Sequence, residues 1–143
     1  MLQKSIFAIL LVVFFSVFAQ AQSVIGVWKT IDDESGEAKS YVTLYMENGK
    51  VYGKITKLLL KDPETTFCEA CKGDLKDKKV QGMVILTNLH EDGKYWKGGK
   101  ILDPNNGKVY TCKIWLDSKN KDKLNVRGYI GPFYRTQEWF RIK

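Results

Sequence analysis

The sequence is 143 residues long, and its 23 lysines and arginines against 16 acidic residues give a formal net charge of +7. This length suits a single domain with a core of its own. The basic residues are interleaved with acidic ones and form no arginine-rich block. The charge therefore indicates a solvated surface and argues against a nucleic-acid-binding protein.

Residues 1–21 have the pattern of a signal peptide. Lys4 supplies a positive charge, residues 6–18 form an apolar run, and Ala21 ends a cleavage site of the A-x-A type. The run is too short for a transmembrane helix, and no later stretch is apolar enough to span a bilayer. We therefore expect an exported protein, periplasmic or secreted, that is cleaved near Ala21 and forms one domain over residues 22–143.

The first strand, residues 24–30, contains the motif Gly26-x-Trp28, and the last strand, residues 133–142, contains Arg141. In a closed barrel the first and last strands are neighbours, so we expect the guanidinium of Arg141 to lie over the indole of Trp28. Such a cation–π contact contributes about 0.5–2 kcal/mol. It also closes one end of the barrel.

The next segments predict a hairpin. Residues 41–46 alternate in polarity, and Asn48-Gly49 follows, which is the strongest short signal for a two-residue turn. The return strand covers about residues 50–60. Gly53 within it indicates a bulge or a close approach of another backbone.

Residues 61–80 form a long irregular connection with no helical period, although the residues around the cysteines allow one helical turn. Loops of this length in compact domains are usually functional segments or lids. For Cys68 and Cys71 we favour a local disulfide, because an exported protein folds under oxidising conditions. A redox-active pair and a metal site remain alternatives, and a zinc site would need Cys112 and His90 as further ligands.

Neither of these further ligands is well placed for a metal. We expect Cys112 to be a small buried core residue, with a bridge to the loop cysteines as an alternative. We expect His90 to lie in a solvated turn beside Glu91. No metal is therefore predicted.

Five more strands complete the pattern, at about residues 83–87, 95–103, 109–116, 124–130 and 133–142. Gly98-Gly99 indicates a bulge in one of them. Eight strands at this spacing are typical of a meander sandwich or an up-and-down barrel. We predict an all-β, eight-stranded antiparallel up-and-down barrel. Its interior is wide enough for packed side chains or for one small ligand.

Several short motifs together resemble one bacterial family. They are Gly26-x-Trp28, Cys68-x-x-Cys71-x-Gly73, Trp96-x-x-Gly99, Asp103-Pro104-x-x-Gly107, Leu124-x-Val126-Arg127-Gly128-Tyr129 and Arg135-Thr136-Gln137-x-Trp139-x-Arg141. The chain is similar over roughly residues 24–143 to the exported family called domain of unknown function 2147. The resemblance implies a small exported domain with a calyx-like barrel, from bacteria with an outer membrane, and it supplies no catalytic residues. The Gly-x-Trp start with a closing arginine is also similar to lipocalins and related calycin barrels, a likeness of fold alone.

Aromatic side chains and arginines recur along the strands and are the candidate ligand-binding residues. The set is Trp28, Tyr52, Trp96, Tyr110, Arg127, Tyr129, Arg135, Trp139 and Arg141. Arg127 and Tyr129 share one face of their strand, and Arg135, Trp139 and Arg141 share one face of the next. Such faces suit a cavity for an amphipathic or anionic ligand. The alternative is that Arg141 plugs the barrel and the other residues cover its outside.

The sequence contains no nucleophile motif, phosphate-binding glycine loop or dinucleotide fingerprint. We therefore expect no cofactor and no catalytic residues. The favoured function is non-catalytic binding of a small apolar or amphipathic ligand in the cell envelope. The alternatives are a protein–protein or envelope-structural module with a filled barrel, and an enzyme that uses the barrel mouth.

Overall fold

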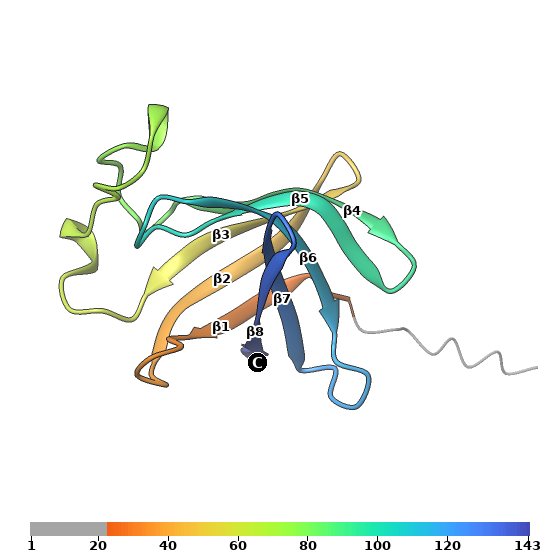
Figure 1. The fold of residues 1–143 in the computed structure, drawn as a ribbon. Coiled ribbons are helices and arrows are strands. Elements are labelled where there is room, and N and C mark those ends of the chain that lie inside the picture. Colours follow the sequence, from red (N-terminus) through yellow and green to blue (C-terminus); the bar gives the residue numbers. More distant parts are fainter. Residues whose placement is uncertain (1–22) are drawn as a thin grey trace, which may run out of the picture.

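The computed structural model describes residues 23–143, which form a closed barrel of eight antiparallel strands (Figure 1). The strands are β1 (Gly26–Ile31), β2 (Ala38–Glu47), β3 (Lys50–Leu58), β4 (Val84–Asp92), β5 (Tyr95–Leu102), β6 (Val109–Leu116), β7 (Lys123–Ile130) and β8 (Phe133–Arg141). Each strand pairs with the next, and β8 pairs with β1. The predicted fold class is confirmed. The predicted signal peptide lies outside the described residues.

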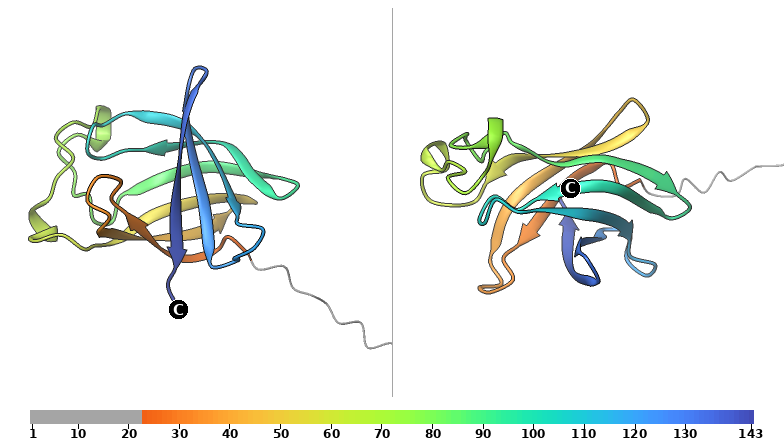
Figure 2. Two further views of the ribbon diagram at one scale, coloured as in Figure 1. Left: turned by 60° about the horizontal axis from the view of Figure 1, so that its bottom comes forward. Right: turned by 45° about the horizontal axis from the view of Figure 1, so that its top comes forward.

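The connection between β3 and β4 contains two short 3₁₀ turns, η1 (Pro63–Thr65) and η2 (Gly73–Leu75). It lies to one side of the barrel, and the β7–β8 hairpin projects from the barrel in a different direction (Figure 2). Within residues 23–143, no helix has the length and apolar character needed to cross a membrane.

Strand β4 is longer than its apolar run suggests. Asn88 adopts a φ of 57°, which interrupts the alternation, so that Leu86 and Leu89 are both buried although they are three residues apart. The strand then continues to Asp92. His90, expected in a turn, instead lies on β4 and pairs with Lys97 of β5, so that expectation was wrong.

Gly53 marks a bulge in β3, which is one of the two alternatives predicted for it, and the atoms packed closest to it belong to side chains and not to another backbone. The β3–β4 register shifts on both sides of it. A Cβ atom at this position would lie 2.8 Å from Leu44 Cδ2 and 2.7 Å from Leu86 Cδ1. The missing side chain lets these two leucines meet across the curved wall. Gly99 follows a second register shift, between β5 and β6, so the bulge predicted there is confirmed as well.

Trp28 and Arg141 close one end of the barrel. Trp28 is fully buried, and its indole N–H donates to the Val24 carbonyl at 2.8 Å. The Arg141 guanidinium carbon lies 4.3 Å from the centre of the indole ring, which confirms the predicted contact. The same guanidinium donates to the carbonyls of Ser23 at 2.8 Å and Ile25 at 3.2 Å.

The glycine of the Gly-x-Trp motif makes room for this arrangement. Gly26 has a φ of 137°, which side chains rarely allow, and a Cβ atom there would lie 3.1 Å from Arg141 Nη1. The β1–β8 ladder has two residue pairs, Trp28 with Arg141 and Lys29 with Phe140. Because this seam is short, the hydrogen bonds of the guanidinium to the segment before β1 add to what joins the two ends of the chain.

We expect Arg141→Ala to lower the free energy of unfolding by about 2–3 kcal/mol, since it removes the cation–π contact and several charged hydrogen bonds. Arg135→Ala on the same strand is the matched control, because Arg135 makes an exposed ion pair worth less than about 1 kcal/mol. Urea unfolding of both variants measures the difference. Equal losses in the two variants would contradict this account of the closed end.

Asp122 makes the stability of the closed end depend on pH. Its carboxylate lies 2.8 Å from Lys143 Nζ and 3.3 Å from Arg141 Nε. The hydrogen bond from Lys143, with the charges of Lys143 and Arg141, lowers the pKa of Asp122 below its ordinary value of 3.8. Asp122 therefore stabilises the folded state fully at pH values above the pKa that its carboxyl has in the unfolded chain. This stabilisation is lost as the pH falls through the lowered pKa of the folded state.

Asp122→Asn should accordingly lower the melting temperature at neutral pH and make it fall less steeply below about pH 4. Thermal unfolding followed across the acid range tests this, with Asp74→Asn, in an exposed position of the β3–β4 connection, as the control. A variant whose acid sensitivity equals that of the parent would show that this carboxylate is not linked to folding.

Candidate ligand-binding site

The end of the barrel opposite Arg141 is not filled. It contains a cavity of about 1010 Å³, at the upper limit of the usual range for small-molecule sites. The β1–β2, β3–β4 and β5–β6 connections surround its mouth. Its apolar lining includes Ile31, Ile55, Leu58, Leu60, Phe67, Val80, Ile85, Ile101, Leu102, Val126 and Trp139. The walls and floor therefore suit an apolar group.

Two hydroxyl groups interrupt the apolar wall. Thr30 and Ser40 are directly opposite each other on β1 and β2, and their side-chain oxygens are 2.7 Å apart. They are 7% and 5% exposed and are the buried polar residues of the described chain. The Thr30 hydroxyl also lies 3.4 Å from the Ser40 carbonyl oxygen. Since a hydroxyl has one proton and two lone pairs, this pair keeps acceptor capacity for a donor group of a ligand.

The mouth of the cavity carries the opposite charge from the chain as a whole. Its lining includes five carboxylates and two basic side chains. The carboxylates are Asp32, Asp33, Glu34, Glu69 and Asp103, and the basic side chains are Lys39 and Arg135. The full chain has a formal net charge of +7. The local excess of carboxylates favours polar groups that are neutral or positively charged over anions.

An ion pair ties the β1–β2 turn to β8 across this mouth. Arg135 Nη2 lies 2.5 Å from Asp33 Oδ2, and the Gln137 amide donates to the same oxygen at 2.8 Å. The turn is shaped from within by Asp32, whose carboxylate accepts the backbone N–H of Ser35 at 2.8 Å. This hydrogen bond is the main cause of the lowered pKa of Asp32.

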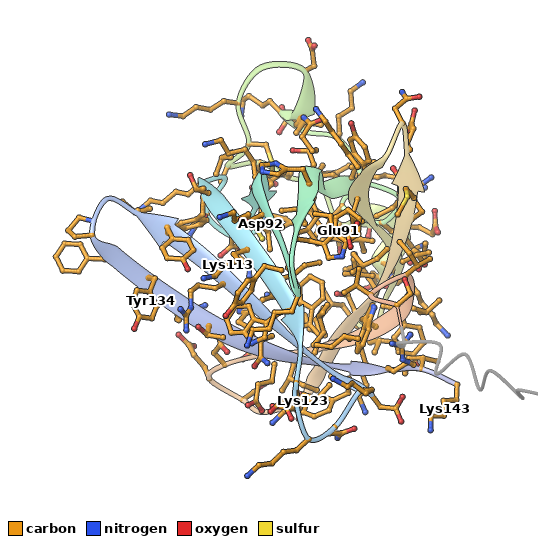
Figure 3. The ribbon with its side chains drawn as sticks, turned by 90° about the vertical axis from the view of Figure 1, so that its right-hand side faces the viewer. Glu91, Asp92, Lys113, Lys123, Tyr134 and Lys143 are labelled. Carbon is orange, nitrogen blue, oxygen red and sulfur yellow. A yellow bond between two sulfur atoms is a disulfide. The ribbon has the colours of Figure 1, made fainter. Side chains whose placement is uncertain are left out.

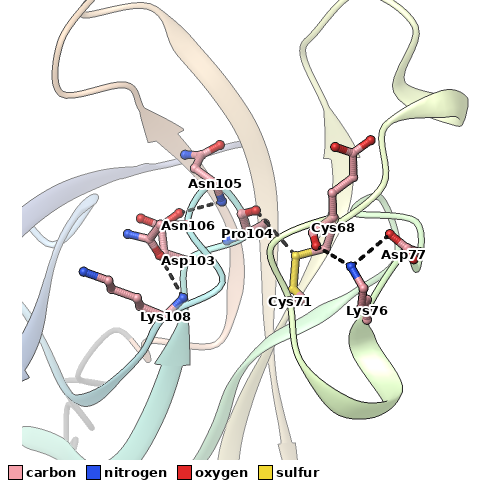
Figure 4. Close-up of a disulfide and its surroundings, with 10 residues drawn as sticks. Cys68, Cys71, Lys76, Asp77, Asp103, Pro104, Asn105, Asn106 and Lys108 are labelled. Carbon is pink, nitrogen blue, oxygen red and sulfur yellow. Dashed lines mark hydrogen bonds and ion pairs between the residues drawn. A yellow bond between two sulfur atoms is a disulfide. The ribbon is translucent and has the colours of Figure 1, made fainter.

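The β3–β4 connection is held by the Cys68–Cys71 disulfide, so the predicted pairing is confirmed (Figure 4). The Cys68 N–H donates to the Lys78 carbonyl and the Asp77 N–H donates to the Cys68 carbonyl, both at 2.8 Å. Phe67 pairs with Lys79 as an isolated antiparallel bridge. The disulfide therefore sits inside a small hairpin-like loop and fixes its shape.

This loop packs against the β5–β6 turn (Figure 4). The Cys68 sulfur lies 3.5 Å from the Pro104 carbonyl oxygen, a contact and not a hydrogen bond, because a bridged sulfur carries no proton. Gly107 adopts a φ of 70°, and a Cβ atom there would overlap the carbonyl of Ala70. Gly107 thus allows the disulfide loop to lie directly on the turn at the edge of the cavity.

The other chemically reactive residues lie apart from one another. Cys112 is unbridged and buried, which excludes the alternative bridge, and burial raises the pKa of its thiol to about 12. His90 is exposed, and its ring covers Gly98. Residues 23–143 contain no cluster of three or more potential metal ligands.

Three of the predicted ligand-binding residues line the cavity, namely Tyr110, Arg135 and Trp139. Trp28 and Arg141 belong to the closed end. Trp96 is half-buried and packs against the core.

The remaining three residues, Tyr52, Arg127 and Tyr129, lie on the outside. The Tyr52 hydroxyl donates to the Asn88 side chain at 2.6 Å. On β7 the inner face belongs to Val126 and Gly128, which line the cavity, so the alternation turns Arg127 and Tyr129 outward. The aromatic–arginine face of β7 is therefore on the outside of the barrel, whereas that of β8, with Arg135 and Trp139, is on the inside.

The prediction from sequence did not include the hydroxyl pair or the acidic mouth. Ser40 lies on the same face of β2 as Val42 and Leu44, which are buried. A polar residue in this inward-facing series was the sequence feature that could have predicted the hydroxyl pair. Asp33 and Arg135 are far apart in the sequence, and no local pattern connects them.

The comparisons with known proteins agree with this architecture. The family described as "Uncharacterized protein conserved in bacteria (DUF2147)" matches residues 26–141. No curated protein matches the chain. A solved structure from the human pathogen Helicobacter pylori, described as belonging to the lipocalin family, is similar with a TM-score of 0.72 and 20% identity, covering 86% of this chain and 85% of that one. At this identity the likeness shows a lipocalin-like fold and nothing more.

The matched segment begins at the glycine that accommodates the closing arginine and ends at that arginine, so it contains the whole barrel. The chain belongs to the bacterial family DUF2147.

Proposed function

We propose that this protein binds a small apolar or amphipathic molecule, without catalysis, in the open end of its barrel. The observation that carries the proposal is the cavity of about 1010 Å³, closed at one end by core side chains and walled by apolar residues. A barrel filled by its own side chains, as a purely structural module requires, would not leave this space. Eight-stranded barrels of this kind are wide enough for one small ligand.

The polar groups of the cavity favour an amphipathic ligand whose polar end donates hydrogen bonds. An apolar part would contact Val126 and Trp139, which line the interior. The Thr30 and Ser40 hydroxyls would accept a hydrogen bond from the ligand. Its polar end would lie near Glu34 and Glu69 at the mouth, where carboxylates outnumber basic groups. We therefore favour a ligand whose polar end is neutral or positively charged over an anionic one.

We also propose that the protein is exported to the periplasm or secreted. The support is the signal-peptide pattern of residues 1–21, with cleavage near Ala21. The Cys68–Cys71 disulfide is consistent with this, because structural disulfides persist in oxidising compartments. A cell-envelope ligand would then be available to the cavity.

A side chain that fills part of the cavity should weaken ligand binding. Gly128→Leu places a side chain toward the interior of β7, and its Cβ would lie 3.3 Å from Tyr110 Cβ, a contact that small shifts relieve. We expect this variant to weaken binding of the neutral apolar probe N-phenyl-1-naphthylamine by about tenfold or more. Fluorescence titration measures the dissociation constant.

Asn125→Leu is the matched control for this substitution. It adds the same side chain to the outer face of the same strand, where Asn125 pairs with Trp115. This variant should bind the probe like the parent. If both variants bind unchanged, or if the parent does not bind the probe, the proposed site is wrong.

The disulfide loop should control how fast a ligand enters and leaves. Gly107→Ala would push the Ala70 segment away from the β5–β6 turn, so we expect faster association and dissociation of the same probe in stopped-flow fluorescence. Gly93→Ala is the control, because Gly93 has a φ of 60° but no neighbouring atom within 4 Å of a new Cβ. Equal rate changes in both variants would assign the effect to backbone strain instead of loop displacement.

A further inference from the structure

The outer face of β5 to β8 carries cations stacked on aromatic rings. Lys113 Nζ lies 4.5 Å from the ring centre of Tyr95 and 5.5 Å from that of Trp115. The Arg127 guanidinium carbon lies 4.9 Å from the ring centre of Trp115 and 4.3 Å from that of Tyr134. Figure 3 shows Lys113 and Tyr134 on this side of the barrel. In the described part of the chain neither cation has an ion-pair partner, so both charges are available to an external anion.

Arg127 is held in a fixed orientation. It lies between two aromatic rings, and its Nε donates to the Thr136 hydroxyl at 2.7 Å. Within residues 23–143 its two terminal amino groups have no hydrogen-bond partner. An arginine fixed in this way loses little side-chain freedom when it binds an oxyanion. Its planar N–H groups match phosphate oxygens in particular.

The β7–β8 hairpin adds an exposed apolar tip beside these cations. Phe133 is 76% exposed, Tyr134 61% and Ile130 50%. Phe133 and Tyr134 are the two most exposed large hydrophobic residues in the described chain. The hairpin extends beyond the body of the barrel (Figure 2). A soluble protein rarely exposes such residues together unless another surface covers them.

We propose that this hairpin and the adjoining outer face dock on an anionic lipid bilayer. Phe133 and Ile130 would enter the boundary between headgroups and acyl chains, while Lys113 and Arg127 contact headgroup phosphates. Tyrosine and tryptophan rings, here Trp115 and Tyr134, prefer the headgroup level of membranes. A soluble acidic polymer would satisfy the cations but leave the apolar tip in water. A bilayer accounts for both features.

This surface is distinct from the proposed ligand site, although the two lie close together. Arg135, which lines the cavity mouth, is two residues from Phe133. The tip therefore belongs to the open end of the barrel. Docking through it would bring the mouth near the bilayer, whether or not the cavity binds a ligand.

Vesicle co-sedimentation tests the proposal, using phosphatidylcholine vesicles with and without phosphatidylglycerol. We expect binding to the anionic vesicles that decreases as salt is raised. The double variant Lys113→Gln/Arg127→Gln should bind about 25-fold more weakly, about fivefold for each basic residue near an anionic surface. Phe133→Ser should weaken binding by about tenfold or more, because it removes the apolar anchor.

Two controls match these variants elsewhere on the barrel. Lys57→Gln removes a lysine whose Nζ lies 5.8 Å from the ring centre of Tyr41, and Met46→Ser removes a side chain that is 51% exposed beside another hairpin turn. Both should bind vesicles like the parent, and every variant should still unfold in one cooperative thermal transition above the temperature of the binding assay, which shows that it is folded when tested. Equal binding to neutral vesicles, equal losses in the controls, or binding to soluble polyphosphate without binding to vesicles would each overturn the proposal.

Discussion

The contact of the Arg141 guanidinium with the Trp28 indole determines how this barrel is organised. It joins the last strand to the first at a seam of two residue pairs and closes one end with a buried aromatic ring. Gly26 is required beside it, because a side chain there would press on the guanidinium. With one end closed in this way, the interior can remain open at the other end without losing a packed core.

The open end combines features that act together on a ligand. The walls are apolar, the hydroxyls of Thr30 and Ser40 provide a polar point inside, and carboxylates predominate at the mouth. The ion pair of Asp33 with Arg135 and the Cys68–Cys71 loop hold the rim from two sides. The cations that the chain has in excess lie elsewhere, including the outer face around Arg127. Charge is thus separated between the cavity mouth and the outer surface.

Much of this architecture could be predicted from local sequence pattern. Alternation, turn residues and the Gly-x-Trp start predicted the eight strands and the closing contact, and Gly53 predicted a bulge in β3. The inner face of each strand was harder to assign, since a two-residue period fits either face. For β8 the sequence did contain enough to assign the inner face, because placing Arg141 inside also places Arg135 and Trp139 inside.

The register across the β7–β8 turn, which pairs Gly128 with Arg135, then turns Arg127 outward. Contacts such as that of Asp33 with Arg135 join distant segments and have no local signal in the sequence.

The central claim is that the cavity holds a small molecule. Native mass spectrometry of the protein purified from its own bacterium tests this claim most directly. We expect an additional mass of a small apolar or amphipathic molecule that is lost on denaturation. A ligand-free mass that stays unchanged after incubation with such molecules would contradict the claim.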